Sequence, residues 1–257
     1  MKVSCLQPPS PGKLWVLRIA LPVLVLLGSG AFAAPNEIKV FTDEIAPEGK
    51  YTVETHVNAV RAPRQPVSGF QRLQVMPEIS YGVRPNWEAS LQLPVASTTD
   101  GWRGNGVRGE LQYVAPHSDD SGAYWGVNLE IAYLSRVAEA AYWNIELVPI
   151  LGYRWREWHI SVNPAVNRAF TGQQRQVLFE PALKVSRAVA NSHQLGIEYY
   201  AETGPLRNWI PPSERYRVLY AAWDFRYRDV DINLGIGKGI GAASDRNVLK
   251  AIVELPF

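Results

Sequence analysis

Glutamates recur along this chain, nearly one in each of a series of segments in which apolar and polar residues alternate. Carboxylates gathered on one face could select solutes by charge. They could equally form a network of hydrogen bonds and ion pairs with nearby bases, because side chains largely fill the narrowest barrels. Both interpretations stay open. The residues predicted to share this polar face are Glu54, Glu78, Glu88, Arg108, Glu110, Glu130, Glu146, Glu180, Lys184, Glu198, Lys250 and Glu254.

Nucleophilic catalysis would need a histidine within reach of an activated serine. His159 and Ser161 share one face of an alternating segment, but the hydrolase pattern of histidine and serine beside asparagine and glycine is absent. His117 stands in a Ser-Asp-Asp turn and is predicted to be solvated. The chain is therefore not expected to be an enzyme, and no catalytic residue is predicted. The histidines are His56, His117, His159 and His193.

Metal, cofactor and nucleic-acid sites are not expected either. The histidines are scattered and Cys5 is the only cysteine, so no zinc-ligand spacing is present. The glycines of 235–239 form a turn cluster and not a phosphate or dinucleotide loop. No Lys/Arg cluster suggests a nucleic-acid partner.

The first 33 residues have the order of a secretory signal peptide. Lys2 and Lys13 precede an apolar run, and Ala31-Phe32-Ala33 forms the cleavage signature, with cleavage expected after Ala33 or Ala34. The uninterrupted apolar core, 19–27, is shorter than the roughly 20 residues that a membrane-spanning helix needs. The sequence thus predicts a leader over 1–33 and one domain over 34–257.

Removal of the leader changes the composition. Cys5 leaves, so the exported chain has no thiol for a disulfide. Lys2, Lys13 and Arg18 leave as well, so 23 of the 26 bases remain against 24 acids, and the mature chain is close to neutral.

After residue 34 the hydrophobic pattern has a period of two residues, which is typical of strands with two different faces. Most segments have about 10 residues, the length that a tilted strand needs to cross a bilayer. The sequence therefore predicts twelve strands, with ten as the alternative. The segments are 48–60, 70–83, 86–96, 106–115, 124–134, 142–152, 157–169, 176–186, 193–202, 217–226, 229–237 and 248–257.

Period-two alternation fits both a membrane barrel and a soluble barrel with its faces inverted. The apolar face of these segments is rich in Trp, Leu, Val and Tyr, and charges rarely interrupt it. A lysine or arginine at the bilayer midplane costs roughly 2–4 kcal/mol, so this face suits lipid. Aromatic residues near the segment ends, such as Trp87 and Trp125, suit interfacial girdles. The membrane barrel is the favoured prediction.

The connections and the last strand agree with this prediction. Short links at 84–86, 154–156 and 227–228 alternate with longer polar ones, as in barrels with short periplasmic turns. The chain stops on Phe257, an aromatic residue at the end of an alternating segment. We interpret Phe257 as a C-terminal signal for the barrel-assembly machinery.

These features together resemble bacterial outer-membrane β-barrels over the whole mature chain. Residues 40–54 (VFTDEIAPEGKYTVE) resemble the first strand of small transporters grouped with the phenol-degradation-pathway outer-membrane protein. The resemblance implies a passage for small molecules, hydrophobic ones among them.

The sequence thus predicts an all-β fold, a transmembrane antiparallel up-and-down β-barrel in the outer membrane of a Gram-negative bacterium. The predicted function is porin-like: passage or facilitated uptake of small molecules through a polar, acid-lined lumen, with membrane lipid and a small solute as partners. Two alternatives remain, a closed barrel with a structural or surface-interaction role and an outer-membrane lipid-modifying enzyme.

Overall fold

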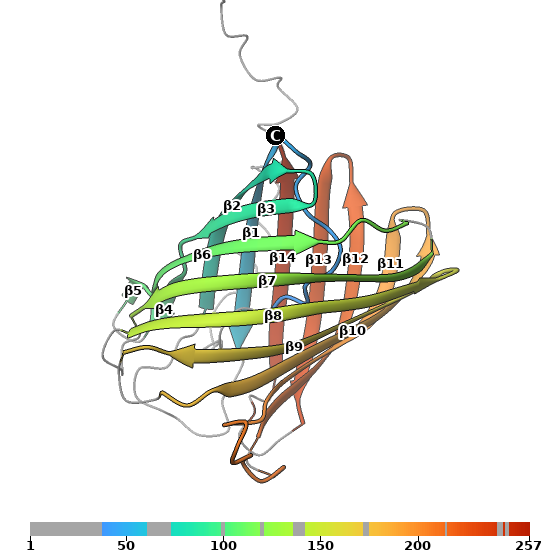
Figure 1. The fold of residues 1–257 in the computed structure, drawn as a ribbon. Coiled ribbons are helices and arrows are strands. Elements are labelled where there is room, and N and C mark those ends of the chain that lie inside the picture. Colours follow the sequence, from blue (N-terminus) through green and yellow to red (C-terminus); the bar gives the residue numbers. More distant parts are fainter. Residues whose placement is uncertain are drawn as a thin grey trace, which may run out of the picture.

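The computed structural model describes residues 38–60, 73–98, 101–118, 121–135, 142–171, 175–213, 215–240, 244 and 247–257. Within these residues the regular structure is antiparallel strand, and the strands close into a barrel (Figure 1). The predicted leader, 1–33, lies outside the described residues. The strands are β1 (Tyr51–Val60), β2 (Leu73–Arg84), β3 (Trp87–Gln92), β4 (Val95–Thr98), β5 (Gly101–Gly104), β6 (Gly106–Val114), β7 (Gly122–Leu134), β8 (Tyr142–Trp155), β9 (Trp158–Ala169), β10 (Leu178–Ala190), β11 (His193–Glu202), β12 (Tyr216–Tyr227), β13 (Val230–Gly239) and β14 (Asn247–Pro256).

The barrel closes because β1 pairs with β2 on one side and with β14 on the other. Pairing of the first strand with the last closes the wall, as a sheet surrounded by lipid requires, and β5 stands at the end of the sheet order, beside β4. Two barrel strands are interrupted: β3 and β4 both pair with β2, and β5 and β6 pair with β4 and β3 in turn. Pro94, which has no N–H for the ladder, lies at the first interruption. The fourteen segments therefore form twelve barrel strands, and the predicted number is confirmed.

The two faces of each strand differ as the alternation predicts. On β1, Thr52, Glu54 and His56 are buried, whereas Tyr51 is 50% exposed. On β7, Glu130 is buried and Ile131 is 47% exposed. The polar face thus points inward and the apolar face outward, which is the arrangement of a barrel that stands in a membrane. In the part of the chain that the structure describes, no helix combines the length and apolar character needed to span a membrane.

Tight turns join the strands at one end of the barrel. Asn86, Arg156, Ser192 and Arg228 each have a positive φ, between 53° and 70°, in the short links after β2, β8, β10 and β12. Two-residue hairpin turns of this kind match the twist of the flanking strands. The start of β1 and Phe257 lie at the same end, where the Phe257 N–H donates to the Tyr51 carbonyl (2.8 Å).

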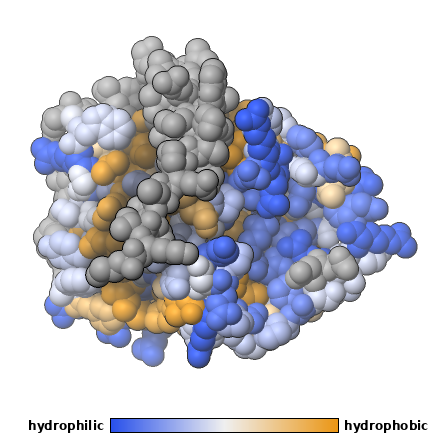
Figure 2. Space-filling view, turned by 90° about the horizontal axis from the view of Figure 1, so that it is seen from above, coloured by the Kyte–Doolittle hydropathy of each residue, from blue (hydrophilic) through white to orange (hydrophobic). Residues whose placement is uncertain are grey.

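Aromatic residues cluster on the outer surface at this tight-turn end. The Tyr113 ring lies 4.9 Å from that of Trp87 and 5.7 Å from that of Trp125, measured between centroids. Arginines of the turns lie over neighbouring rings, such as Arg84 over Trp87 at 4.8 Å. Amphipathic rings of this kind belong at a membrane interface. Figure 2, a view onto this end, shows hydrophobic residues (orange) mainly at the left and lower left and hydrophilic ones (blue) mainly at the right.

Candidate functional site: the barrel interior

Residues 38–48, here called the inner segment, precede β1 and lie inside the barrel (Figure 1, blue). Two apolar side chains of the segment, Ile38 and Phe41, pack against different parts of the barrel interior. Ile38 packs with Val60, Val218, Tyr220 and Val248, and Phe41 packs with Tyr124, Val148, Ile150 and Ala165. The sequence interpretation missed this arrangement: it began the first strand at residue 48 and compared 40–54 with the first strand of other barrels. The strand instead begins at Tyr51, after a turn at 47–50.

The backbone of Phe41 is held by β9. Asn163 accepts a hydrogen bond from the Phe41 N–H (2.8 Å) and donates one to the Phe41 carbonyl (3.0 Å). The Ser161 hydroxyl donates to the same carbonyl (2.8 Å). The polar backbone of this buried residue therefore has partners, which burial requires.

Asp43 is the charged anchor of the inner segment. Arg154 of β8 donates to both of its carboxylate oxygens, at 3.1 and 2.5 Å, and the His117 ring lies 2.8 Å away. Burial alone would raise the pKa of the Asp43 carboxyl. The hydrogen bond and charge of Arg154, with the His117 hydrogen bond, outweigh burial and lower that pKa. The prediction that His117 is solvated is wrong, because its side chain is 13% exposed and contacts Asp43.

The remainder of the inner segment crosses to β6 and β3. Gln112 donates to the Thr42 and Glu44 carbonyls at 3.4 and 3.3 Å, and the Ala46 N–H donates to Glu88 at 2.5 Å. Glu44 is exposed by surface area, but desolvation by the surrounding barrel raises the pKa of its carboxyl, against the opposing charge of Lys184. The segment is thus attached at several points around the interior.

Where the inner segment leaves the barrel it passes close to β2. A Cβ on Gly82 would lie 2.2 Å from the Pro47 carbonyl oxygen, so only glycine allows this approach. The Gly49 N–H donates to the Gly82 carbonyl (2.8 Å), and Gly49 itself has a φ of 72°. These two glycines permit the turn from the inner segment into β1.

The strand register sets carboxylates side by side on the inward face in two rows. The first row crosses four neighbouring strands and contains Asp231, Glu254, Glu54 and Glu78. The second crosses β6, β7 and β8 and contains Glu110, Glu130 and Glu146. Like charges directly opposite one another are destabilising unless donors or cations compensate for them. Six of the twelve residues that were predicted to share the polar face stand in these rows, and Asp231 was not among the predicted residues.

Amide side chains and one arginine contact the carboxylates of the two rows, and Gln92 links one row to the other. Gln92 of β3 donates to Glu78 (3.1 Å) and to Glu110 (2.6 Å). Asn128 also donates to Glu110 (2.9 Å). Arg108 forms an ion pair with Glu130 at 3.3 Å. Glu78 and Glu110 thus receive hydrogen bonds from neutral amides, which leave their negative charge in place, whereas Arg108 offsets the charge of Glu130.

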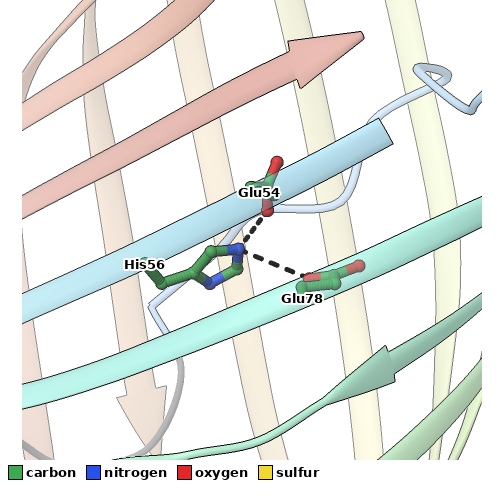
Figure 3. Close-up of side chains that lie close together, drawn as sticks. All are labelled: Glu54, His56 and Glu78. Carbon is green, nitrogen blue, oxygen red and sulfur yellow. Dashed lines mark hydrogen bonds and ion pairs between the residues drawn. The ribbon is translucent and has the colours of Figure 1, made fainter. Parts of the chain in front are cut away.

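A histidine, His56, stands beside the first row, two residues along β1 from Glu54. The Nε2 atom of His56 contacts Glu54 Oε1 and lies 3.5 Å from Glu78 Oε2 (Figure 3). All three side chains are buried, with exposures of 2% to 8%. Lys39 of the inner segment forms an ion pair with Glu54 at 2.9 Å.

A separate cluster of charges lies on β10–β14. Glu198 forms ion pairs with Lys250 and Lys184, and Lys184 also contacts Asp224 at 2.7 Å. Tyr200 donates to Glu198 at 2.8 Å. Here two lysines lie between two acids, whereas in the first row Lys39 pairs with Glu54 and Arg226 with Asp231 at 2.6 Å.

The predicted inward residues divide by burial. Glu54, Glu78, Arg108, Glu110, Glu130, Glu198 and Lys250 are buried, whereas Glu88, Glu146, Glu180, Lys184 and Glu254 are half-buried. Glu180 lies opposite Ala165 in the register, outside both rows.

His159 and Ser161 do share the inward face, but each side chain has another partner. The Tyr124 hydroxyl and His159 Nε2 are 2.6 Å apart, and Ser161 donates to Phe41. Both contacts help to hold the wall beside the inner segment.

No family model and no curated protein matches the chain. Among solved structures, the KdgM porin matches with a TM-score of 0.53 and 9% identity, over 80% of this chain and 99% of that one. An outer membrane channel from Pseudomonas putida F1 matches with a TM-score of 0.59 and 10% identity, over 86% of this chain and all of that one. LpxR from Salmonella typhimurium matches with a TM-score of 0.48 and 6% identity. The chain has the fold of an outer-membrane β-barrel.

Proposed function

We propose that this protein is an outer-membrane channel that admits small molecules through an acid-lined interior. The observation that carries the proposal is the pair of carboxylate rows on the inward face. Rings of acidic side chains favour cations in membrane pores. The resemblance in fold to a porin and to an outer membrane channel supports the same role.

The inner segment controls the space available to solutes in this proposal. It is attached to β9, β8, β6, β3 and β14 by the contacts of Phe41, Asp43, Thr42, Ala46 and Ile38. Solutes would pass beside it or after part of it moves. The same attachment supports the second candidate, a closed barrel with a structural or surface-interaction role.

Three finer assignments belong to this proposal. Phe257 acts in assembly, as the end of the strand that closes on β1. Residues 1–33 are removed on export. The resemblance of 40–54 to the transporters grouped with the phenol-degradation-pathway protein would make hydrophobic molecules candidate solutes. An enzymatic role is not proposed.

Single-channel recording in planar bilayers tests the channel against the closed barrel. The sample is the mature protein, shown to be folded by its heat-modifiable gel mobility. Stable conductance steps are the expected result. The ion-conducting channel would be overturned if folded samples of both the unmodified protein and the Asp43→Ala variant, which loosens the inner segment, gave no conductance.

A further inference from the structure

Glu54, His56 and Glu78 place three metal-ligating atoms close together on two adjacent strands. One ligand atom from each residue lies within 4.8 Å of the other two. Glu54 and Glu78 are directly opposite one another in the register of β1 and β2, and His56 stands two residues along from Glu54 on the same face. In Figure 3 both carboxylates point toward the same ring nitrogen. The donors converge because of the strand pairing.

The surroundings of these donors have an excess of negative charge. Glu254 lies opposite Glu54 on the other side of β1, and Asp231, which pairs with Arg226, extends the row. Lys39 forms an ion pair with one of the three donors, Glu54, at 2.9 Å. Glu78 receives neutral hydrogen bonds, from Gln92 and Ser80. Adjacent buried carboxylates are costly without a compensating charge. A bound cation would supply that charge.

The ligand types select the kind of cation. An imidazole nitrogen with two carboxylates suits zinc and other divalent first-row transition metals. Calcium and magnesium prefer all-oxygen sites. We propose that Glu54, His56 and Glu78 form a binding site for a divalent transition-metal cation in the barrel wall. The three residues leave a coordination position for water or a solute. The site does not depend on the channel role.

Lys39 gives the proposal a second test, because its ammonium group would compete with the metal for the Glu54 carboxylate. A metal bound to Glu54 would displace the ammonium group of Lys39, whose side chain is 27% exposed and can turn toward solvent. Removal of the Lys39 charge should therefore tighten metal binding. A purely structural ion-pair network predicts no such gain.

The test is isothermal titration calorimetry, in which Zn²⁺ is added to the folded mature protein in detergent after EDTA has removed bound metal. We expect one equivalent to bind. His56→Gln should weaken Zn²⁺ binding by at least about 10-fold, because it removes one of the three metal ligands. If His56→Gln does not fold, Glu78→Gln serves in its place, and the same loss is expected. Lys39→Gln should bind more tightly. His159→Gln is the matched control, a buried inward histidine on another wall, and should leave binding unchanged.

Three results would overturn the site. The first is the absence of stoichiometric binding by the folded protein. The second is equal loss in His56→Gln and His159→Gln, which would indicate nonspecific coordination. The third is weaker binding by Lys39→Gln, which would show that Lys39 supports the donors and does not compete with the metal. Heat-modifiable mobility confirms that each variant is folded.

Discussion

The β8–β9 wall and the β14–β1–β2 wall of the barrel differ in how their inward polar groups are paired. The β8–β9 wall holds the inner segment through complementary pairs: Asn163 with the Phe41 backbone and Arg154 with Asp43. The β14–β1–β2 wall sets Glu254, Glu54 and Glu78 side by side. The first wall matches each donor with an acceptor, and the second has more acceptors than bases.

This difference separates attachment from selectivity. Paired buried groups hold a fixed arrangement, because loss of one partner leaves the other unsatisfied. An excess of carboxylates acts at a distance on any ion that enters the interior. Changes in the β8–β9 wall should therefore alter the mobility of the inner segment, and changes in the β14–β1–β2 wall should alter which ions enter.

The largest expected effect comes from the charged anchor. Asp43→Ala removes the acid of an ion pair with Arg154, in which the Asp43 side chain is 5% exposed and the Arg154 side chain 20% exposed. Loss of one partner of such a pair costs about 3 kcal/mol. We expect hydrogen-exchange protection of the 38–48 peptide to fall by about 100-fold, and channel conductance to rise, because the segment opens more often.

The control for this change is Glu48→Ala, at an exposed position of the same segment. It should leave exchange and conductance close to those of the unmodified protein. Equal protection in Asp43→Ala and Glu48→Ala would show that Asp43 does not anchor the segment.

A smaller effect is expected from the packing behind Phe41. A Cβ on Gly152 would lie 1.9 Å from the Tyr124 ring, which packs on Phe41 and contacts His159. Gly152→Ala should therefore lower the free energy of unfolding by about 2 kcal/mol, as overpacking does. Urea unfolding in lipid vesicles measures the change. Gly109→Ala, with nothing within 4 Å of the added Cβ, should have a much smaller effect.

The smallest effect is a pH dependence of the attachment with two opposing parts. Glu44 has a raised pKa inside the barrel, so attachment should strengthen as the pH falls toward its ordinary value of 4.5. Asp43 has a lowered pKa, so its contribution is complete above 3.8 and is lost as the pH falls through the lowered value. Hydrogen-exchange protection of 38–48, corrected for intrinsic exchange rates, should therefore be greatest between pH 3.8 and pH 4.5, the ordinary pKa values of the two carboxyls.

Single substitutions separate the two parts. Glu44→Gln should flatten the limb above the maximum, and Asp43→Asn should remove the limb below it. A maximum that survives both substitutions would assign the pH dependence to other groups.

The barrel could be predicted from sequence because each strand carries its own signal. Tyr51 and Ile131 point outward and Glu54 and Glu130 inward because side chains alternate along a strand, and this needs no knowledge of the neighbours. The membrane setting follows from the same pattern, since the apolar face is the one exposed.

The inner segment could not be predicted in this way. Phe41 and Asn163 are 122 residues apart in the chain, and Asp43 and Arg154 are 111 apart. No local pattern in 38–48 shows which wall these residues meet. The rows of carboxylates were half predictable: the shared face of Glu54, Glu78 and Glu254 follows from alternation, but their alignment depends on register. His117 was misplaced for the same reason, because its partner Asp43 is remote in sequence.

The reversal potential under a salt gradient tests the central claim most directly. The unmodified protein and a Glu110→Gln/Glu254→Gln variant, which removes one carboxylate from each row, are compared in planar bilayers. We predict cation preference for the unmodified protein and a shift toward anions in the variant, at similar conductance. An anion preference in the unmodified protein, or identical reversal potentials in the two, would contradict an acid-lined passage.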